Sequence, residues 1–268
     1  MKRIQDEINS NICQVDSPDD LFFSALDIRA AVGRLKLHKN DGYVGLSSDH
    51  FVNAGDDCLV HISMLFNSIV VHGSLPDIFL YSTIVPIPKG RNVNLSDSSN
   101  YRGIALSSLY GKLFDNAVLM YFSCKLETSD LQFGFKTKHS TSQCTFVLKE
   151  SLSYYVDNNS SVYCAFLDAT KAFDRVNYCK LFRLLIKRKL PVLFVRIILN
   201  FYVSNFVRVS WCGFFSEYFL ATNGVKQGGV LSPVLFCVYL NELLLVLSAA
   251  KVGCSVGSNY VGALAYAD

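Results

Sequence analysis

Three features are missing from the sequence, and each absence excludes a class of protein. The nine cysteines form no C-x-x-C pair and lie singly in apolar segments, so neither a zinc site nor a disulfide framework is indicated. No charged-then-apolar signal peptide opens the chain, because residues 1–7 already carry both acidic and basic side chains. We therefore expect an intracellular protein. No internal repeat or low-complexity tract is present either, which excludes solenoids.

The sequence also lacks a large excess of positive or negative charge. The net charge of +3 is too small to indicate a nucleic-acid partner, although it does not oppose one. Two local clusters, 136–139 and 187–189, are more basic, yet such clusters usually form ordinary solvated faces.

A long uninterrupted apolar run is absent as well. The longest candidate, 230–250, is broken by Ser232, Pro233, Asn241 and Glu242, so we expect a buried helix there and no membrane partner. Hydrophobic residues make up 51% of the 268 residues. This share argues against disorder, and the length is sufficient to bury a sizeable core.

The apolar periodicity predicts a chain that begins with helices. After a lead-in over residues 1–23, the capping box at Ser24–Asp27 starts a helix that ends near Lys39. Further helices are expected over 56–72, 109–125 and 140–156, and from Asn177 onward. Residues 81–87 predict a strand, placed at a sheet edge because of Pro86 and Pro88, and residues 101–106 return beside it. A second hairpin is expected around Gly213.

Two apolar, β-prone segments each end on an aspartate. Val162–Leu167 runs into Asp168, and the final segment from Tyr260 runs into Asp268. Two strands that each place a carboxylate at one rim of a sheet could bind a divalent cation between them, since Mg²⁺ prefers carboxylate oxygens. The alternative is a pair of solvated aspartates at strand ends.

Five short blocks, taken together and in order, resemble reverse transcriptases, with the closest likeness to those of non-LTR (LINE-type) retrotransposons. The resemblance covers roughly 24–268, and the blocks are Ile84–Lys89 with Asn100–Arg102, Gln132–Phe135, Phe166–Asp174, Gln227–Pro233 and Tyr266–Asp268. Each block is weak alone. The agreement in order and spacing is strong.

The resemblance implies an α+β fold, a right-hand polymerase with fingers and palm, in which helices back an antiparallel palm sheet. On this reading residues 24–160 hold the fingers and the helices before them, and residues 161–268 hold the palm. The family's Tyr-Ala-Asp box continues with a second aspartate, whereas Asp268 is the final residue. We therefore expect a fragment without the thumb, one that is inactive as it stands.

The resemblance also implies roles for particular residues. Asp168 and Asp268 would bind two Mg²⁺ ions as catalytic ligands, while Lys89 and Arg102 would reach the triphosphate of the incoming nucleotide. The alternative for this basic pair is ordinary surface charge. Gly103 stands where the family usually has proline, which affects the stiffness of the hairpin more than its chemistry.

Three further positions concern the sugar and the base pair. Phe173 would exclude a ribose 2′-hydroxyl by its bulk, against the alternative of a buried core phenylalanine. Gln227 and Gly228 would approach the substrate closely; a turn alone would need the glycines but not the glutamine. Ser232 is expected to cap the following helix, with Pro233 at its first position. Asp174 is a local structural acceptor near Arg175.

The implied reaction is RNA-directed DNA synthesis, in which a primer 3′-hydroxyl attacks a deoxynucleoside triphosphate. The implied partners are an RNA template, a DNA primer, dNTPs and the rest of a longer polyprotein. Two alternatives stay open. One is a decayed, non-catalytic remnant that at most binds nucleic acid, and the other is a group II intron-type reverse transcriptase.

Overall fold

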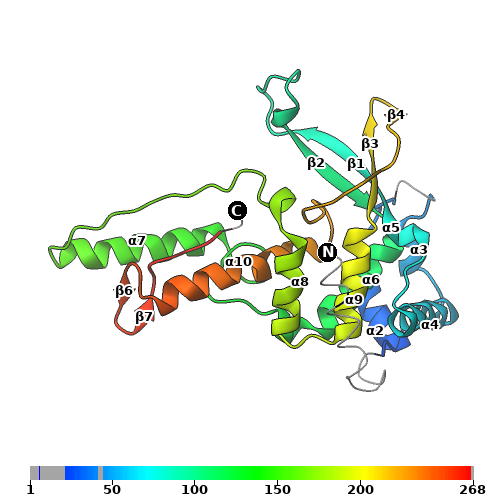
Figure 1. Ribbon diagram of the computed structural model, residues 1–268, viewed down its shortest axis with the longest axis horizontal. Helices are drawn as coiled ribbons and strands as arrows, with labels where there is room; N and C mark the ends of the chain where they lie inside the picture. Colours follow the sequence, from blue (N-terminus) through cyan, green and yellow to red (C-terminus); the bar gives the residue numbers. More distant parts are fainter. Residues whose placement is uncertain (1–5, 7–21, 42–44, 267–268) are drawn as a thin grey trace.

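The computed structural model describes residue 6 and residues 22–41 and 45–266. Figure 1 shows a helical body with a small sheet rising from it, and an arm that extends sideways from the body. Helices and a sheet thus occur together, as expected for a mixed α/β fold.

The body consists of helices that bury one shared core. They are α2 (Ala25–Val32), α3 (Ser48–Val52), α4 (Asp56–His72), α5 (Asp77–Leu80), α6 (Leu109–Tyr121) with the 3₁₀ turn η3 (Ser123–Leu126), α8 (Tyr178–Lys187) and α9 (Val192–Val203). Aromatic rings from several of them meet edge to face, as Phe66 and Phe114 do at 5.1 Å. Edge-to-face contact adds to the stabilisation that burial provides.

The ends of these helices confirm the predicted caps. The Ser24 hydroxyl accepts from the Asp27 amide, and the Asp27 carboxylate accepts from the Ser24 amide at 2.8 Å. Asn177 caps α8, and Gly73 ends α4 in the left-handed conformation at φ 62°. Each cap satisfies amides or carbonyls that the first or last turn leaves unpaired.

The sheet combines two hairpins that are far apart in the sequence. β1 (Tyr81–Pro88) pairs antiparallel with β2 (Tyr101–Ser107) and parallel with β3 (Phe206–Trp211). β4 (Phe214–Phe215) and β5 (Phe219–Leu220) both pair with β3. The 3₁₀ turn η2 (Ser98–Asn100) precedes β2. Both predicted hairpins are therefore present.

The predicted edge position of β1 is wrong, because β1 lies between β2 and β3. The two prolines suggested an edge, since proline cannot donate to a ladder. The pairing with β3 covers only Tyr81–Ile84, so Pro86 and Pro88 lie beyond it, paired with β2 alone. The prolines thus mark where one side of a central strand loses its partner.

The arm contains α7 (Thr141–Asp157), α10 (Ser232–Ala249) and the short β6–β7 hairpin (Ser255–Val256 and Asn259–Tyr260) that follows α10 at the far end. The Tyr155 hydroxyl of α7 donates to the Ser255 carbonyl of this hairpin at 2.6 Å. The prediction of a strand at Val162–Leu167 is wrong: this segment is irregular and exposed. The last predicted strand is limited to Tyr260 in β7 and a single bridge between Ala265 and Gln132. In the described part of the chain, no antiparallel palm sheet is formed from these segments.

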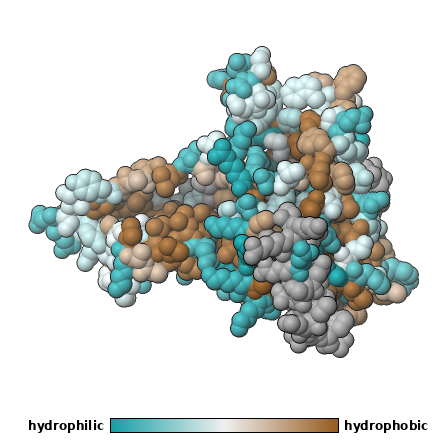
Figure 2. All heavy atoms as spheres, in the orientation of Figure 1, coloured by the Kyte–Doolittle hydropathy of each residue, from teal (hydrophilic) through white to brown (hydrophobic). Residues whose placement is uncertain are grey.

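The physical reason lies in backbone pairing. A β-prone segment becomes a strand only when a neighbour takes its amides and carbonyls, and no ladder partner of Val162–Leu167 occurs among the described residues. Hydrophobic atoms accordingly gather on the surface of the arm (Figure 2).

Helix α10 is the apolar run that the sequence placed in the core. By length and composition it could also cross a membrane, and 39% of it is buried in the protein. Its first turns pack into the body beside α8, where Leu235, Phe236 and Val238 are buried. The helix begins one residue earlier than predicted, with Leu231 as N-cap and Ser232 already helical, because the Ser232 hydroxyl lies 3.2 Å from the Tyr202 hydroxyl instead of capping the backbone.

Candidate functional site

The loop that precedes α10 is hydrogen-bonded to the turn that follows Asp168. The Val225 amide donates to the Phe173 carbonyl at 2.9 Å, and the Gly224 amide donates to the Val176 carbonyl at 3.1 Å. A Cβ on Gly224, whose φ is +85°, would lie 2.7 Å from the Asp174 Cα. Only glycine therefore allows this approach.

The same loop is also hydrogen-bonded to the β1–β2 hairpin. The Ala105 amide donates to the Gln227 carbonyl at 2.6 Å, and a Cβ on Gly228, at φ +103°, would lie 3.0 Å from the Ala105 carbonyl oxygen. The Gln227 side-chain amide donates to the Asp174 carboxylate at 3.3 Å. Gln227 thus joins the hairpin to the turn. Asp174 is an acceptor, as expected, but the donor is the remote Gln227 and not a local group near Arg175.

A cavity of about 140 Å³ lies between this loop and the sheet. Its wall includes the polar side chains of Asp174, Asn205, Asn223 and Gln227. Ligand pockets for drug-sized molecules generally exceed about 300 Å³, so the cavity alone is too small for a nucleotide.

Lys89 and Arg102 lie at the loop end of the β1–β2 hairpin, where the two paired strands end. The Lys89 amide donates to the Asn100 carbonyl at 2.8 Å, which closes the ladder. Arg102 stands opposite Ile87 on the returning strand. Both residues are exposed, and neither takes part in an ion pair found within the described ranges. Their charges are therefore available to an anionic ligand.

Phe173 begins the 3₁₀ turn η4 (Phe173–Arg175) and is half-buried. Its ring stacks on Phe236 of α10 at 4.9 Å and meets Phe135 edge to face at 5.6 Å. One side of the ring therefore packs against the core, while the residue keeps part of its surface exposed.

Asp168 lies in the irregular segment before η4 and is exposed. Its carboxylate takes part in no ion pair found among the described residues, so its oxygens are free in the way that a hard cation requires. The predicted second ligand, Asp268, lies outside the described residues. Within those residues no group of three or more His, Cys, Asp or Glu side chains could hold a metal ion.

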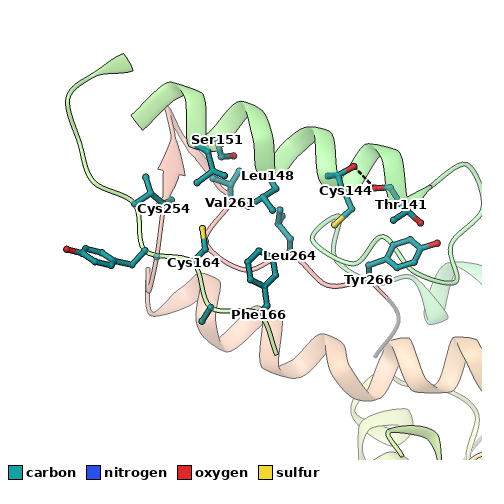
Figure 3. A pocket seen from close by; sticks show the side chains of 17 residues that line it. Thr141, Cys144, Leu148, Ser151, Cys164, Phe166, Cys254, Val261, Leu264 and Tyr266 are labelled. Atoms are coloured by element: carbon teal, nitrogen blue, oxygen red, sulfur yellow. Dashed lines mark hydrogen bonds between the residues drawn. The ribbon is translucent and has the colours of Figure 1, made fainter. Parts of the chain in front are cut away.

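A larger cavity, of about 350 Å³, lies in the arm (Figure 3). Helix α7 forms one wall with Cys144 and Leu148, and Cys164 and Leu264 come from the two segments that the sequence predicted as strands. These segments, 162–166 and 261–266, therefore line the same cavity. The eight cysteines in the part of the chain that the structure describes are all free thiols.

The sequence interpretation missed two buried charges beneath the loop, Asp115 and Lys226. Burial raises the pKa of Asp115 to about 6 and lowers the pKa of Lys226 to about 8, and each charge limits the shift of the other. One signal was present: Asp115 lies one turn from Gly111 and Val118 on the apolar face of its helix. A charge at such a position requires a partner inside the protein.

Comparison with known proteins gives one family and several relatives. The model of the family described as "Reverse transcriptase (RNA-dependent DNA polymerase)" matches residues 87–268. A retrovirus-related Pol polyprotein from a type-2 retrotransposable element of Drosophila melanogaster is 26% identical over 263 residues, which is 97% of this chain and 24% of the relative.

Two further relatives come from the same organism. The RNA-directed DNA polymerase from mobile element jockey is 27% identical over 81% of this chain and 24% of its own length. The probable RNA-directed DNA polymerase from transposon X-element is 27% identical over 91% of this chain and 27% of its own. The chain thus spans about a quarter of the length of the curated relatives that it matches.

Proposed function

Because the chain belongs to the reverse transcriptase (RNA-dependent DNA polymerase) family, we propose that it forms the nucleotide-binding part of a retrotransposon RNA-directed DNA polymerase. One observation supports this proposal most directly. Hydrogen bonds made by Gln227 join the β1–β2 hairpin to the turn of Phe173 and Asp174. These hydrogen bonds bring together three segments that are remote in the sequence.

Each segment interacts with a different part of the incoming nucleotide. Lys89 and Arg102 attract the triphosphate, since exposed basic groups near a site raise the local concentration of an anion. Phe173, held by Phe236 behind it, presents its exposed edge to the sugar. Gln227 and Gly228 lie beneath the nascent base pair, where the absence of a Cβ permits close approach.

The residues expected to bind metal are Asp168 and Asp268. The exposed Asp168 carboxylate fits a hard divalent cation. When bound, Mg²⁺ lowers the pKa of the primer hydroxyl and offsets charge on the departing pyrophosphate.

The partners are an RNA template, a DNA primer and dNTPs, encountered inside the cell as part of a longer polyprotein. We assign the fingers and pre-fingers helices to 24–160 and the palm to 161–268. β3, β4 and β5, which come from the second range, complete a sheet begun by β1 and β2. The two parts therefore share a sheet at the site.

Primer extension on an RNA template with Mg²⁺ tests the proposal. The longest natural chain that contains these residues should extend a DNA primer with dNTPs, and Asp168→Asn should reduce the rate by about a hundredfold or more because a metal ligand is lost.

The matched control is Asp157→Asn, which changes an exposed carboxylate at the end of α7 and should leave the rate unchanged. If that longest natural chain shows no extension while circular dichroism shows it folded, it is a non-catalytic remnant. An equal effect of both substitutions would show that the site lies elsewhere.

A further inference from the structure

Beneath the Gln227 loop two opposite charges are buried in the body. Asp115 of α6 is 6% exposed and Lys226 is 7% exposed. The two residues that precede Asp115 in α6, Leu113 and Phe114, are apolar and buried. Burying charge is costly, so the position of these two groups requires an explanation.

The Asp115 carboxylate lies at the start of α10. It accepts a hydrogen bond from the Leu231 amide at 3.3 Å, and Leu231 is the N-cap residue of α10, which has no side-chain cap of its own. A neighbouring helix thus supplies the acceptor and the negative charge that a helix N-terminus favours. Through this bond Asp115 fixes where α10 begins.

The Lys226 ammonium lies over the ring of Phe201 in α9, 3.9 Å from the centroid. Among the residues that the structure describes, it finds no hydrogen-bond acceptor. Its attraction to Asp115 and to the ring therefore holds it in place.

The backbone of Lys226 belongs to the same turn. Its carbonyl accepts from the Gly229 amide at 3.0 Å, while its neighbours Val225 and Gln227 bind Phe173 and Ala105. A Cβ on Gly229 would lie 2.7 Å from the Ser232 hydroxyl oxygen, so a larger residue there would force that hydroxyl to move. The Lys226 side chain points into the body. Its burial therefore also sets the direction in which the next residue, Gln227, points.

We propose that Asp115 and Lys226 are a positioning pair, which holds the Gln227–Gly228 loop and the first turn of α10 in one arrangement and so presents Gln227 to the nucleotide. The inference rests on the proposed function, because it assigns Gln227 to the nucleotide. The pair touches no substrate itself.

Stability alone does not account for the pair. An aspartate whose pKa is raised to about 6 stabilises the fold below its unfolded pKa, and this contribution is lost as the pH rises through about 6. A lysine whose pKa is lowered to about 8 stabilises the fold above its unfolded pKa, and this contribution is lost as the pH falls through about 8. Both charges are present between these values, where the pair lowers stability.

Other groups around the pair do not change this conclusion. Lys112 of α6 lowers the pKa of Asp115 only as the last of its causes, and its own pKa is lowered by burial. Burial raises the pKa of Tyr202 of α9 far above its usual value. The hydroxyl of Tyr202 thus stays neutral through the whole window.

Amide hydrogen exchange of the 268-residue chain tests the proposal, with thermal unfolding measured in parallel. The Ala105 amide, which donates to Gln227, reports the loop directly. Its protection factor at pH 7, where both charges of the pair are present, measures how firmly the pair holds the loop.

Four variants separate positioning from simple packing. The double variant Asp115→Leu/Lys226→Met should reduce the Ala105 protection at pH 7 about tenfold without lowering Tm, because replacing both charges leaves no unpaired charge in the core. Lys226→Arg should preserve most of the protection, because the positive charge is kept. Asp115→Asn alone should lower both the protection and Tm, because it leaves the Lys226 charge buried without a partner. Lys180→Met, which removes an exposed lysine above the Tyr239 ring, is the matched control and should change nothing.

Two results would overturn the proposal. One is unchanged Ala105 protection in Asp115→Leu/Lys226→Met, and the other is a uniform loss of protection with a lower Tm in that double variant, which simple packing predicts. A dNTP-binding titration of the same samples keeps the proposed function separate. Failure of the wild type to bind dNTPs would count against the function alone, since the exchange profile does not depend on nucleotide.

Discussion

At the scale of single residues, the position of Phe173 is compatible with both roles that the sequence presented as alternatives, core packing and exclusion of a ribose 2′-hydroxyl. Its ring stacks on Phe236 and so contributes to the core. It is also half-exposed beside the Gln227 loop, to which its carbonyl is bonded. Packing on one side fixes the ring, and a fixed ring is what steric exclusion of a 2′-hydroxyl requires.

Replacing Phe173 by alanine should therefore weaken the choice between sugars. In the longest natural chain, Phe173→Ala should reduce the preference for dNTPs over rNTPs by about tenfold or more, since a lost steric barrier acts on the disfavoured substrate. The measurement is the ratio of kcat/KM values for the two nucleotides in primer extension.

The control for this prediction is Phe135→Ala, which removes the ring that meets Phe173 edge to face but leaves Phe173 itself. An unchanged nucleotide preference in Phe173→Ala, with normal folding, would reject the gate. Loss of folding would show that packing is the main role of this residue.

At the scale of elements, local signals predicted the helices well. Ser24, Ser140 and Asn177 cap the helices that follow them, and the inward face predicted for α4 is buried at Leu59, Ile62, Phe66 and Ile69. Caps and 3.6-residue periodicity involve neighbours within a few positions, so one segment contains the information.

Pairing between remote segments could not be predicted in the same way. The parallel alignment of Tyr81 with Phe206 and the bond from Gln227 to Asp174 join positions far apart in the sequence. The β propensity of Val162–Leu167 predicted a strand, yet propensity supplies no partner. The candidate site residues were chosen by their sequence blocks, whereas the burial of Asp115 and Lys226 depends on tertiary packing that no single segment reveals.

The close contact between the loop and the η4 turn leads to a prediction about Gly224. Gly224→Ala should lower the free energy of unfolding by about 3 kcal/mol or more, because left-handed strain adds to a clash with the Asp174 backbone. Chemical denaturation of the 268-residue chain measures this change.

Gly213 offers a matched control, because it has the same φ of +85° and no atom within 4 Å of the place that a Cβ would take. Gly213→Ala should lower the free energy of unfolding by only about 1 kcal/mol, through the backbone conformation alone. Equal losses for both substitutions would show that the approach to Asp174 is not tight.

At the scale of the whole molecule, the body and the arm differ in how well they bury apolar surface. Helix α7 has no buried residue, and in the segment beside it Tyr163, Phe166 and Leu167 are 95%, 84% and 91% exposed. Exposed apolar surface of this kind promotes association.

We therefore predict that Phe166→Glu reduces self-association of the 268-residue chain without lowering Tm, because the side chain contributes little to the core. Sedimentation over a concentration series measures the effect, and Ser160→Glu, at a nearby exposed position, controls for added charge. Equal self-association of wild type and Phe166→Glu would show that this segment is not the surface through which the chains associate.

The parallel pairing of β1 with β3 also has a consequence for how the protein is made. Thr83 and Arg208, which are bonded across these strands, are 125 positions apart. During synthesis the β1–β2 hairpin and the helices before it leave the ribosome long before β3 exists. The Tyr81–Ile84 part of β1 therefore stays unpaired on one side while the intervening residues are translated. Forming a contact between segments so far apart in the sequence is intrinsically slow.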